Sequence, residues 1–257
     1  GRSCSPRASA PSTLGGASTC DARGAKGTGG HFAAASQVQC RPPATDPRCA
    51  ALSRIRFTSS HPLDFSDELL ECFAPAALGG VKRLCAHLHL PVQSGSNAVL
   101  ARMGRHHLIE TYIEQMARAR RLNPDIALST DLIVGFPGET EADFQDTIRL
   151  LDEVQFDSIY AFAYSSRPGT RAAKLPDDVS VALKNERLNR LLDHQTSISQ
   201  PRYTSRVGRK MEVLVEGLAK NEKLMRTRPG TQERVWTGRT ECNRVVNFPT
   251  DSPRDFR

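Results

Sequence analysis

The apolar positions of this chain change their spacing along its length, and these changes mark its secondary structure. Short segments rich in apolar residues predict strands at residues 55–59, 84–92, 126–134 and 156–164, and in the second of them apolar and polar positions alternate. Between them, apolar residues three or four positions apart predict helices, the clearest at residues 108–122. Strands that alternate with helices favour parallel pairing, so this part of the chain is predicted to be an α/β domain.

Helix-capping residues support this pattern. Ser66 and Ser96 each precede a helical stretch, and Thr140 is followed three residues later by Asp143, the spacing of a capping box. A long polar helix is predicted over residues 179–199. In such a fold, polar residues at the carboxyl ends of the parallel strands line one rim, where the ligands of α/β proteins bind.

The predicted secondary structure changes from helix to short strands after Pro201. Residues 211–216, 234–239 and 244–248 predict the short strands of a small β module, too few for a closed barrel. Residues 202–257 carry thirteen Lys and Arg against seven Asp and Glu, a net charge of +6, whereas the rest of the chain carries +1. This concentration of positive charge near the C-terminus indicates a polyanionic partner, most simply nucleic acid. A solvated basic surface is the alternative.

The N-terminal segment, residues 1–53, has a different composition. Ala, Gly, Pro, Ser and Thr fill 32 of the first 50 positions. Such a segment buries too little apolar area to offset its ordering entropy, so we predict that it is disordered and unrelated to the rest of the chain. The sequence has no run of about 18 apolar residues and no apolar leader, which predicts a cytoplasmic protein without a membrane span.

Two loops carry candidate chemistry. The string HLPVQSGS, residues 89–96, offers side-chain donors and helix amides to a ligand, and an ordinary capped loop is the alternative. Asp131 lies in an apolar strand, where a carboxylate is costly unless paired, and the GFPGE turn after it permits close approach of a ligand. A structural Asp before a Gly/Pro turn is the alternative there. His87 and His89 share a strand face, and the seven cysteines show no CxxC or CxxxCxxC spacing, so no metal site is predicted.

Four strings, IRFTSSHP, HLHLPVQSGS, LIVGFPGET and GRTECNRVVNF, occur in this order between residues 54 and 248. Together they resemble the radical-SAM methylthiotransferases, and most of all the branch that modifies tRNA. The resemblance implies a partial (β/α) radical-SAM barrel followed by a TRAM-type β module that binds RNA. It also implies a monomer that uses S-adenosylmethionine and two 4Fe–4S clusters. The implied reaction adds a methylthio group to C2 of an N6-isopentenylated adenosine in the anticodon stem-loop of tRNA.

This sequence departs from the family pattern, because it lacks the CxxxCxxC cluster loop and the N-terminal cluster domain. The resemblance therefore covers the second half of the barrel, residues 54–200, and a truncated TRAM module, residues 201–257. No cluster ligand and no catalytic residue can be assigned. We expect an incomplete and inactive fragment of a tRNA methylthiotransferase. A ribosomal-protein methylthiotransferase and a non-catalytic RNA-binding remnant are the alternatives.

The resemblance also implies where ligands bind. S-adenosylmethionine is expected at the strand ends of the barrel, and RNA is expected on the β module. The expected cofactor-binding residues are Gln93, Ser94, Arg105, Ser129 and Asp131, and the expected RNA-binding residues are Lys210, Arg239, Asn243 and Arg244.

Overall fold

The computed structural model describes residues 52–57, 61–219 and 234–250. All of them belong to one compact unit, Ala35–Arg257. The segment 1–53, predicted from its composition to be disordered, lies outside the described residues except for its last two positions.

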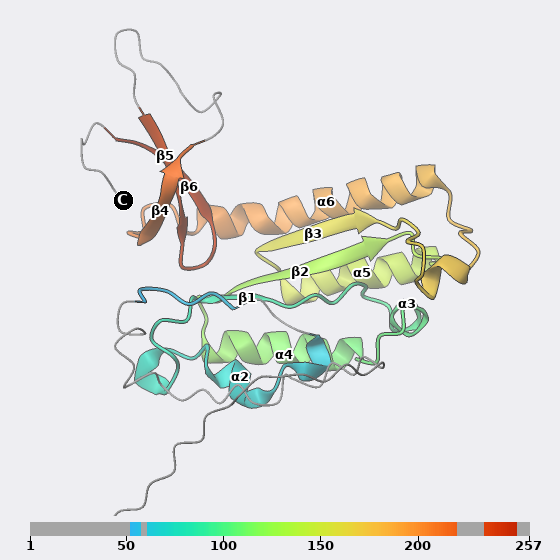
Figure 1. The fold of residues 1–257 in the computed structure, drawn as a ribbon, viewed down its shortest axis with the longest axis horizontal. Helices are drawn as coiled ribbons and strands as arrows, with labels where there is room; N and C mark the ends of the chain where they lie inside the picture. Colours follow the sequence, from blue (N-terminus) through green and yellow to red (C-terminus); the bar gives the residue numbers. More distant parts are fainter. Residues whose placement is uncertain (1–51, 58–60, 220–233, 251–257) are drawn as a thin grey trace, which may run out of the picture. The chain divides into compact units, whose positions relative to one another are not determined.

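A parallel sheet forms the centre of the described chain (Figure 1). Its strands are β1 (His87–His89), β2 (Ala127–Val134) and β3 (Ser158–Ala163), in the order β1-β2-β3, and both pairings are parallel. The predicted parallel α/β arrangement is confirmed. A closed barrel is not formed by the described strands.

One of the predicted strands is shorter than the hydrophobic pattern indicates, and another is described only in part. Residues 58 and 59 of the expected strand 55–59 lie outside the described residues, and its described part makes a bridge between Ile55 and Leu84. The expected strand 84–92 pairs continuously only over β1 and then makes one further bridge, between Gln93 and Leu132. Gln93 has a left-handed φ of 79°, so regular extended backbone does not continue past residue 92.

The helices begin where the capping residues predict. Ser66, Ser96 and Thr140 each accept a hydrogen bond from a backbone N–H of the first turn, and the capping box of Thr140 with Asp143 is complete. None of the described helices is long and apolar enough to cross a bilayer. The helices are α2 (Asp67–Glu71), α3 (Asn97–Arg102), α4 (Ile109–Leu122), α5 (Glu141–Val154) and α6 (Val181–Thr204), with 3-10 turns η1 (Pro62–Asp64), η2 (Ala76–Leu78) and η3 (Ala172–Lys174).

Helix α6 is longer than predicted, because it continues through Pro201 to Thr204. Proline removes one helical hydrogen bond and favours a break. Here the last turn is stabilised from outside, since the Arg202 guanidinium donates to the Asp157 carboxylate at 2.9 Å. Tertiary contacts therefore override the local signal.

One face of the parallel sheet packs against α4, α5 and α6. Leu88, Leu128 and Leu132 point to this side and are fully buried in the core. Burial of such side chains stabilises the fold by roughly 1.5–3 kcal/mol each. The helices contribute Tyr112 and Met116 from α4, Phe144, Leu150, Leu151 and Val154 from α5, and Leu191 and Ile198 from α6.

A second, antiparallel sheet follows α6. It consists of β4 (Val213–Leu218), β5 (Arg234–Thr240) and β6 (Val245–Thr250), in the order β4-β5-β6. The register of β4 against β5 shifts between Val215 and Gly217. The three predicted β segments after Pro201 are therefore confirmed, each within a few residues of its expected bounds.

Candidate functional site

The face of the parallel sheet opposite the helices carries a group of polar side chains, here called the polar face. Because successive side chains of a strand point to opposite faces, His87 and His89 share this face with Ser129 and Asp131. In the ladder His89 pairs with Ser129, and Asp131 pairs with Tyr160 of β3. The Tyr160 side chain is 51% exposed, so the face is open to a ligand at this end.

A hydrogen-bonded chain connects these side chains. Ser129 Oγ lies 3.0 Å from His87 Nε2 and 3.0 Å from His89 Nδ1. His89 Nε2 lies 3.4 Å from Asp131 Oδ1, which favours a proton on that nitrogen. A hydroxyl has one proton, so Ser129 then donates to His89 and accepts from His87.

His87 is held neutral by its surroundings. Burial lowers its pKa from 6.5 to about 4, and the neighbouring His89 and Arg56 act in the same direction. At neutral pH the imidazole is therefore uncharged and donates to Ser129 without adding positive charge. The pairing of Asp131 with His89 also explains how a carboxylate is tolerated in an apolar strand.

The QSGS loop, residues 93–96, is hydrogen-bonded to the first turns of α5. Gly95 N donates to Thr147 Oγ1 at 3.0 Å, and the Ser96 hydroxyl, which caps α3, donates to Asp143 Oδ1 at 2.5 Å. A Cβ at Gly95 would lie 2.5 Å from the Asp146 carbonyl oxygen, so only glycine permits this approach. Ser94 is buried, and its hydroxyl accepts from Ser96 N–H.

The GFPGE turn is anchored to the start of α6. Gly135 has a φ of 69°, and a Cβ there would lie 2.3 Å from Lys184 Cγ. Its N–H donates to Glu139 Oε1 at 2.9 Å, and the same oxygen accepts from Arg187 at 2.8 Å. Gly138 N–H donates to Asp178 at 2.7 Å. This turn is therefore fixed in place by its own residues and by α6.

The structure brings together some of the expected cofactor-binding residues. Gln93 N–H donates to the Asp131 carbonyl at 2.9 Å, and Ser129 precedes Asp131 by two positions on the same face of β2. Ser94 and Ser129 use their hydroxyls for internal partners. Arg105 is half-buried in the loop after α3. Burial lowers the pKa of His61 and the charge of Arg105 acts in the same direction, so Arg105 lies near His61.

Sequence reasoning misses two members of the polar face as ligand-facing residues. It treats His89 only as a possible metal ligand, and Tyr160 only as part of a strand. The His89 and Tyr160 rings meet edge to face with centroids 5.6 Å apart. The alternation in the string HLH is the signal for the first residue. Tyr160 could have been found by assigning the side chains of residues 156–164 alternately to the two faces of a strand.

The expected RNA-binding residues divide into two environments. Lys210 is exposed, and Arg239 is 38% exposed, with its Nε 3.0 Å from Glu216. Asn243 has a φ of 64°, and its Oδ1 lies 3.5 Å from Arg239 NH1. Arg244 is instead bound internally, 2.5 Å from Asp157.

The described residues offer no place for a metal cluster. Among them, no three His, Cys, Asp or Glu side chains are grouped closely enough to hold a metal ion. Cys85 and Cys242 are buried free thiols. These residues do not fit an iron–sulfur cluster, and no chemical step is assigned to one.

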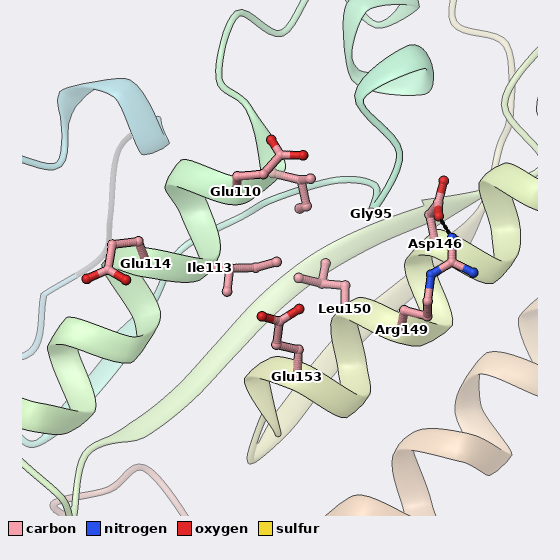
Figure 2. Close-up of a pocket in the computed structure, with 9 residues that line it drawn as sticks. Gly95, Glu110, Ile113, Glu114, Asp146, Arg149, Leu150 and Glu153 are labelled. Atoms are coloured by element: carbon pink, nitrogen blue, oxygen red, sulfur yellow. Dashed lines mark ion pairs between the residues drawn. The ribbon is translucent and has the colours of Figure 1, made fainter.

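A hollow of about 370 Å³ lies between α4 and α5, away from the polar face. Figure 2 shows residues that line it, among them Glu110 and Glu114 on α4 and Asp146, Arg149 and Glu153 on α5. Four carboxylates against one guanidinium make this hollow unsuitable for a polyanion. RNA is therefore not expected to bind on this side.

Comparison with known proteins shows which proteins this chain is similar to. The protein-family model described as "Radical SAM superfamily" matches residues 48–151. The tRNA-2-methylthio-N(6)-dimethylallyladenosine synthase of Acetivibrio thermocellus is 46% identical over 201 residues, covering 78% of this chain and 39% of that protein. The same-named protein of Syntrophobacter fumaroxidans is 46% identical over 198 residues, covering 77% and 40%. The chain thus spans about two fifths of the length of the curated relatives it matches.

A solved structure, coproporphyrinogen III oxidase (HemN) of Escherichia coli, is 20% identical with a TM-score of 0.41, covering 58% of this chain and 32% of that one. That likeness is too weak to bear on function. The sequence identities show that the chain is similar to radical-SAM methylthiotransferases over about 200 residues. The resemblance inferred from the four strings is confirmed. The radical-SAM resemblance implies S-adenosylmethionine and iron–sulfur chemistry.

Proposed function

We propose that this chain is part of a tRNA methylthiotransferase that modifies C2 of an N6-isopentenylated adenosine next to the anticodon. The identity of 46% over 201 residues to a protein named for this reaction carries the proposal. The proposed enzyme is a cytoplasmic monomer that uses two 4Fe–4S clusters, whose ligands are not among the described residues. The proposed domains are the half-barrel, residues 54–200, and the TRAM-type module, residues 201–257.

The polar face of the parallel sheet is the proposed site for S-adenosylmethionine. The Asp131 carboxylate, which is 32% exposed, keeps acceptor capacity for a ligand there, and Gln93 is bound beside it through its backbone N–H. A carboxylate accepts hydrogen bonds from the amino and hydroxyl groups that this cofactor carries. Ser129 and Ser94 support the site by fixing His89 and the QSGS loop, and Arg105 is proposed to approach the cofactor carboxylate.

S-adenosylmethionine, when bound, supplies a methyl group and a carbon radical to the reaction. The residues of this chain bind and orient it and exclude water. His89 and Asp131 can in addition hold a proton at Nε2, because the Ser129 hydroxyl fixes the imidazole orientation. Lys210, Arg239 and Asn243 are the proposed contacts to the RNA backbone.

Equilibrium dialysis with radiolabelled S-adenosylmethionine tests the cofactor site. We expect saturable binding to the full chain and roughly 10- to 150-fold weaker binding to Asp131→Asn, because a charge-assisted hydrogen bond contributes roughly 1.5–3 kcal/mol. Asp152→Asn is the matched control. Asp152 lies on the helix side, 2.6 Å from His194, and its variant should bind within twofold of the parent. Equal loss in both variants, or no saturable binding, would contradict the proposal.

A further inference from the structure

A single buried carboxylate connects the half-barrel to the β module. Asp157 precedes β3, and its side chain is 7% exposed. Its Oδ2 accepts from Leu128 N–H at 3.0 Å and from Arg202 of α6 at 2.9 Å. Its Oδ1 accepts from Arg244 at 2.5 Å. Arg244 lies in the connection between β5 and β6, so one side chain joins three elements that are distant in sequence.

Arg244 is enclosed on its other sides. Its guanidinium lies over the Tyr203 ring, 4.3 Å from the ring centroid, and its side chain is 12% exposed. The atoms Nε and NH1, which have no partner among the described residues, are buried as well. A phosphate could therefore reach Arg244 only after the module had moved away from Asp157 and Tyr203.

The same turn is bound a second time, by arginines from the start of the described chain. Arg54 NH1 donates to the Arg239 carbonyl at 2.9 Å, and Arg56 NH2 donates to the Thr240 carbonyl at 2.7 Å. Guanidinium groups bound to backbone carbonyls fix position without needing a particular side chain on the partner. The β5–β6 connection is thus held from both sides.

We propose that Asp157, Arg244 and Tyr203 form a clasp that fixes the β module on the half-barrel, and that Arg244 is a positioning residue and not an RNA contact. The role of the clasp in holding RNA rests on the proposed function. A module on a loose linker would sample many positions, whereas a docked module holds its RNA at a defined distance from the cofactor site and raises its effective concentration there. Lys210, Arg239 and Asn243 remain exposed or half-buried for RNA.

Limited trypsin digestion of the full chain tests the clasp without RNA or cofactor. The rate of cleavage after Arg206 and Arg209, in the segment between α6 and β4, is followed by mass spectrometry. We expect at least tenfold faster cleavage in Arg244→Ala and in Tyr203→Ala, and rates within twofold of the parent in Arg239→Ala, the matched arginine on the open side of the module. Parent-like rates in both clasp variants would overturn the proposal.

Folding of the module is followed in the same samples through Trp236, which is the one tryptophan of the chain and lies on β5. If Arg244→Ala unfolds the module, Asp157→Asn gives the same test, because this substitution lies in the half-barrel and changes no residue of the module. In filter binding, Arg244→Ala should keep stem-loop affinity within twofold, and a loss of fivefold or more would overturn the positioning role. If the parent binds no RNA at all, the proposed function fails while the cleavage result still decides the clasp.

Discussion

The ion pair between Glu139 and Arg187 holds the turn after β2, and its burial allows a sharp prediction. The two side chains are 2% and 3% exposed, with 2.8 Å between Oε1 and NH1. Arg187 also donates to the Glu139 carbonyl at 3.1 Å, and its guanidinium lies over the Phe144 ring at 5.7 Å. Burial raises the pKa of Glu139 even though Gly135 N–H and Arg187 act to lower it.

Arg187→Met should therefore be strongly destabilising at pH 7. It leaves a buried carboxylate without its counter-ion, a loss of about 3–5 kcal/mol in the free energy of unfolding. Because the folded pKa of Glu139 is raised above its unfolded value, the stabilisation from its neutral form is present below about pH 4.5 and is lost as pH rises through the folded pKa. The variant should accordingly recover stability on acidification, relative to the parent chain.

Urea denaturation followed by circular dichroism measures these differences. Arg190→Met is the control, because Arg190 lies on the same helix and over the same Phe144 ring but is 42% exposed, and its loss should cost less than about 1 kcal/mol. Adding Glu139→Gln to Arg187→Met should restore part of the lost stability, since the uncompensated charge is gone. Losses that are equal in the two arginine variants, or that simply add in the double variant, would refute this reasoning.

Two further predictions concern the sheet face and its loop. The folded pKa of His87, about 4, lies below its unfolded value of 6.5, so the stability it contributes is full above pH 6.5 and is lost as pH falls towards 4. Denaturation at pH 7 and pH 4.5 should show up to about 3 kcal/mol more loss in the parent than in His87→Gln, and equal losses would contradict this. Gly95→Ala should lower stability by about 1–3 kcal/mol, because its Cβ meets backbone of α5 at 2.5 Å. Gly169→Ala, with no atom within 4 Å of its Cβ, should lose only about 1 kcal/mol from its left-handed φ; a smaller loss in Gly95→Ala would be the contrary result in thermal melts.

Local signals in the sequence are sufficient for the starts of the capped helices and for part of the polar face. The caps at Ser96 and Thr140 fix where α3 and α5 begin, because the bonds that satisfy the first turn are made within a few residues. The alternation around His87 and His89 places both side chains on one face. An apolar strand with one carboxylate also indicates that Asp131 needs a partner.

The remaining features depend on contacts between distant residues. The strand expected at residues 84–92 pairs continuously only over His87–His89, because strand length is set by a neighbour and not by alternation alone. Helix α6 passes Pro201 because Asp157 holds Arg202. Charge alone could not tell that Arg244 binds this same carboxylate, since a basic residue suits a phosphate or a buried Asp equally well.

The measurement that tests the central claim most directly compares the binding of three ligands to the full chain. They are an anticodon stem-loop that contains N6-isopentenyladenosine, the same RNA with unmodified adenosine, and a ribosomal protein, measured by fluorescence anisotropy at several salt concentrations. A tRNA methylthiotransferase should bind the isopentenylated RNA most tightly, with an affinity that falls steeply as salt rises because phosphate contacts release counterions. Arg239→Ala should reduce the salt slope by about one unit. Tighter binding to the ribosomal protein, or equal binding to both RNAs, would contradict the account.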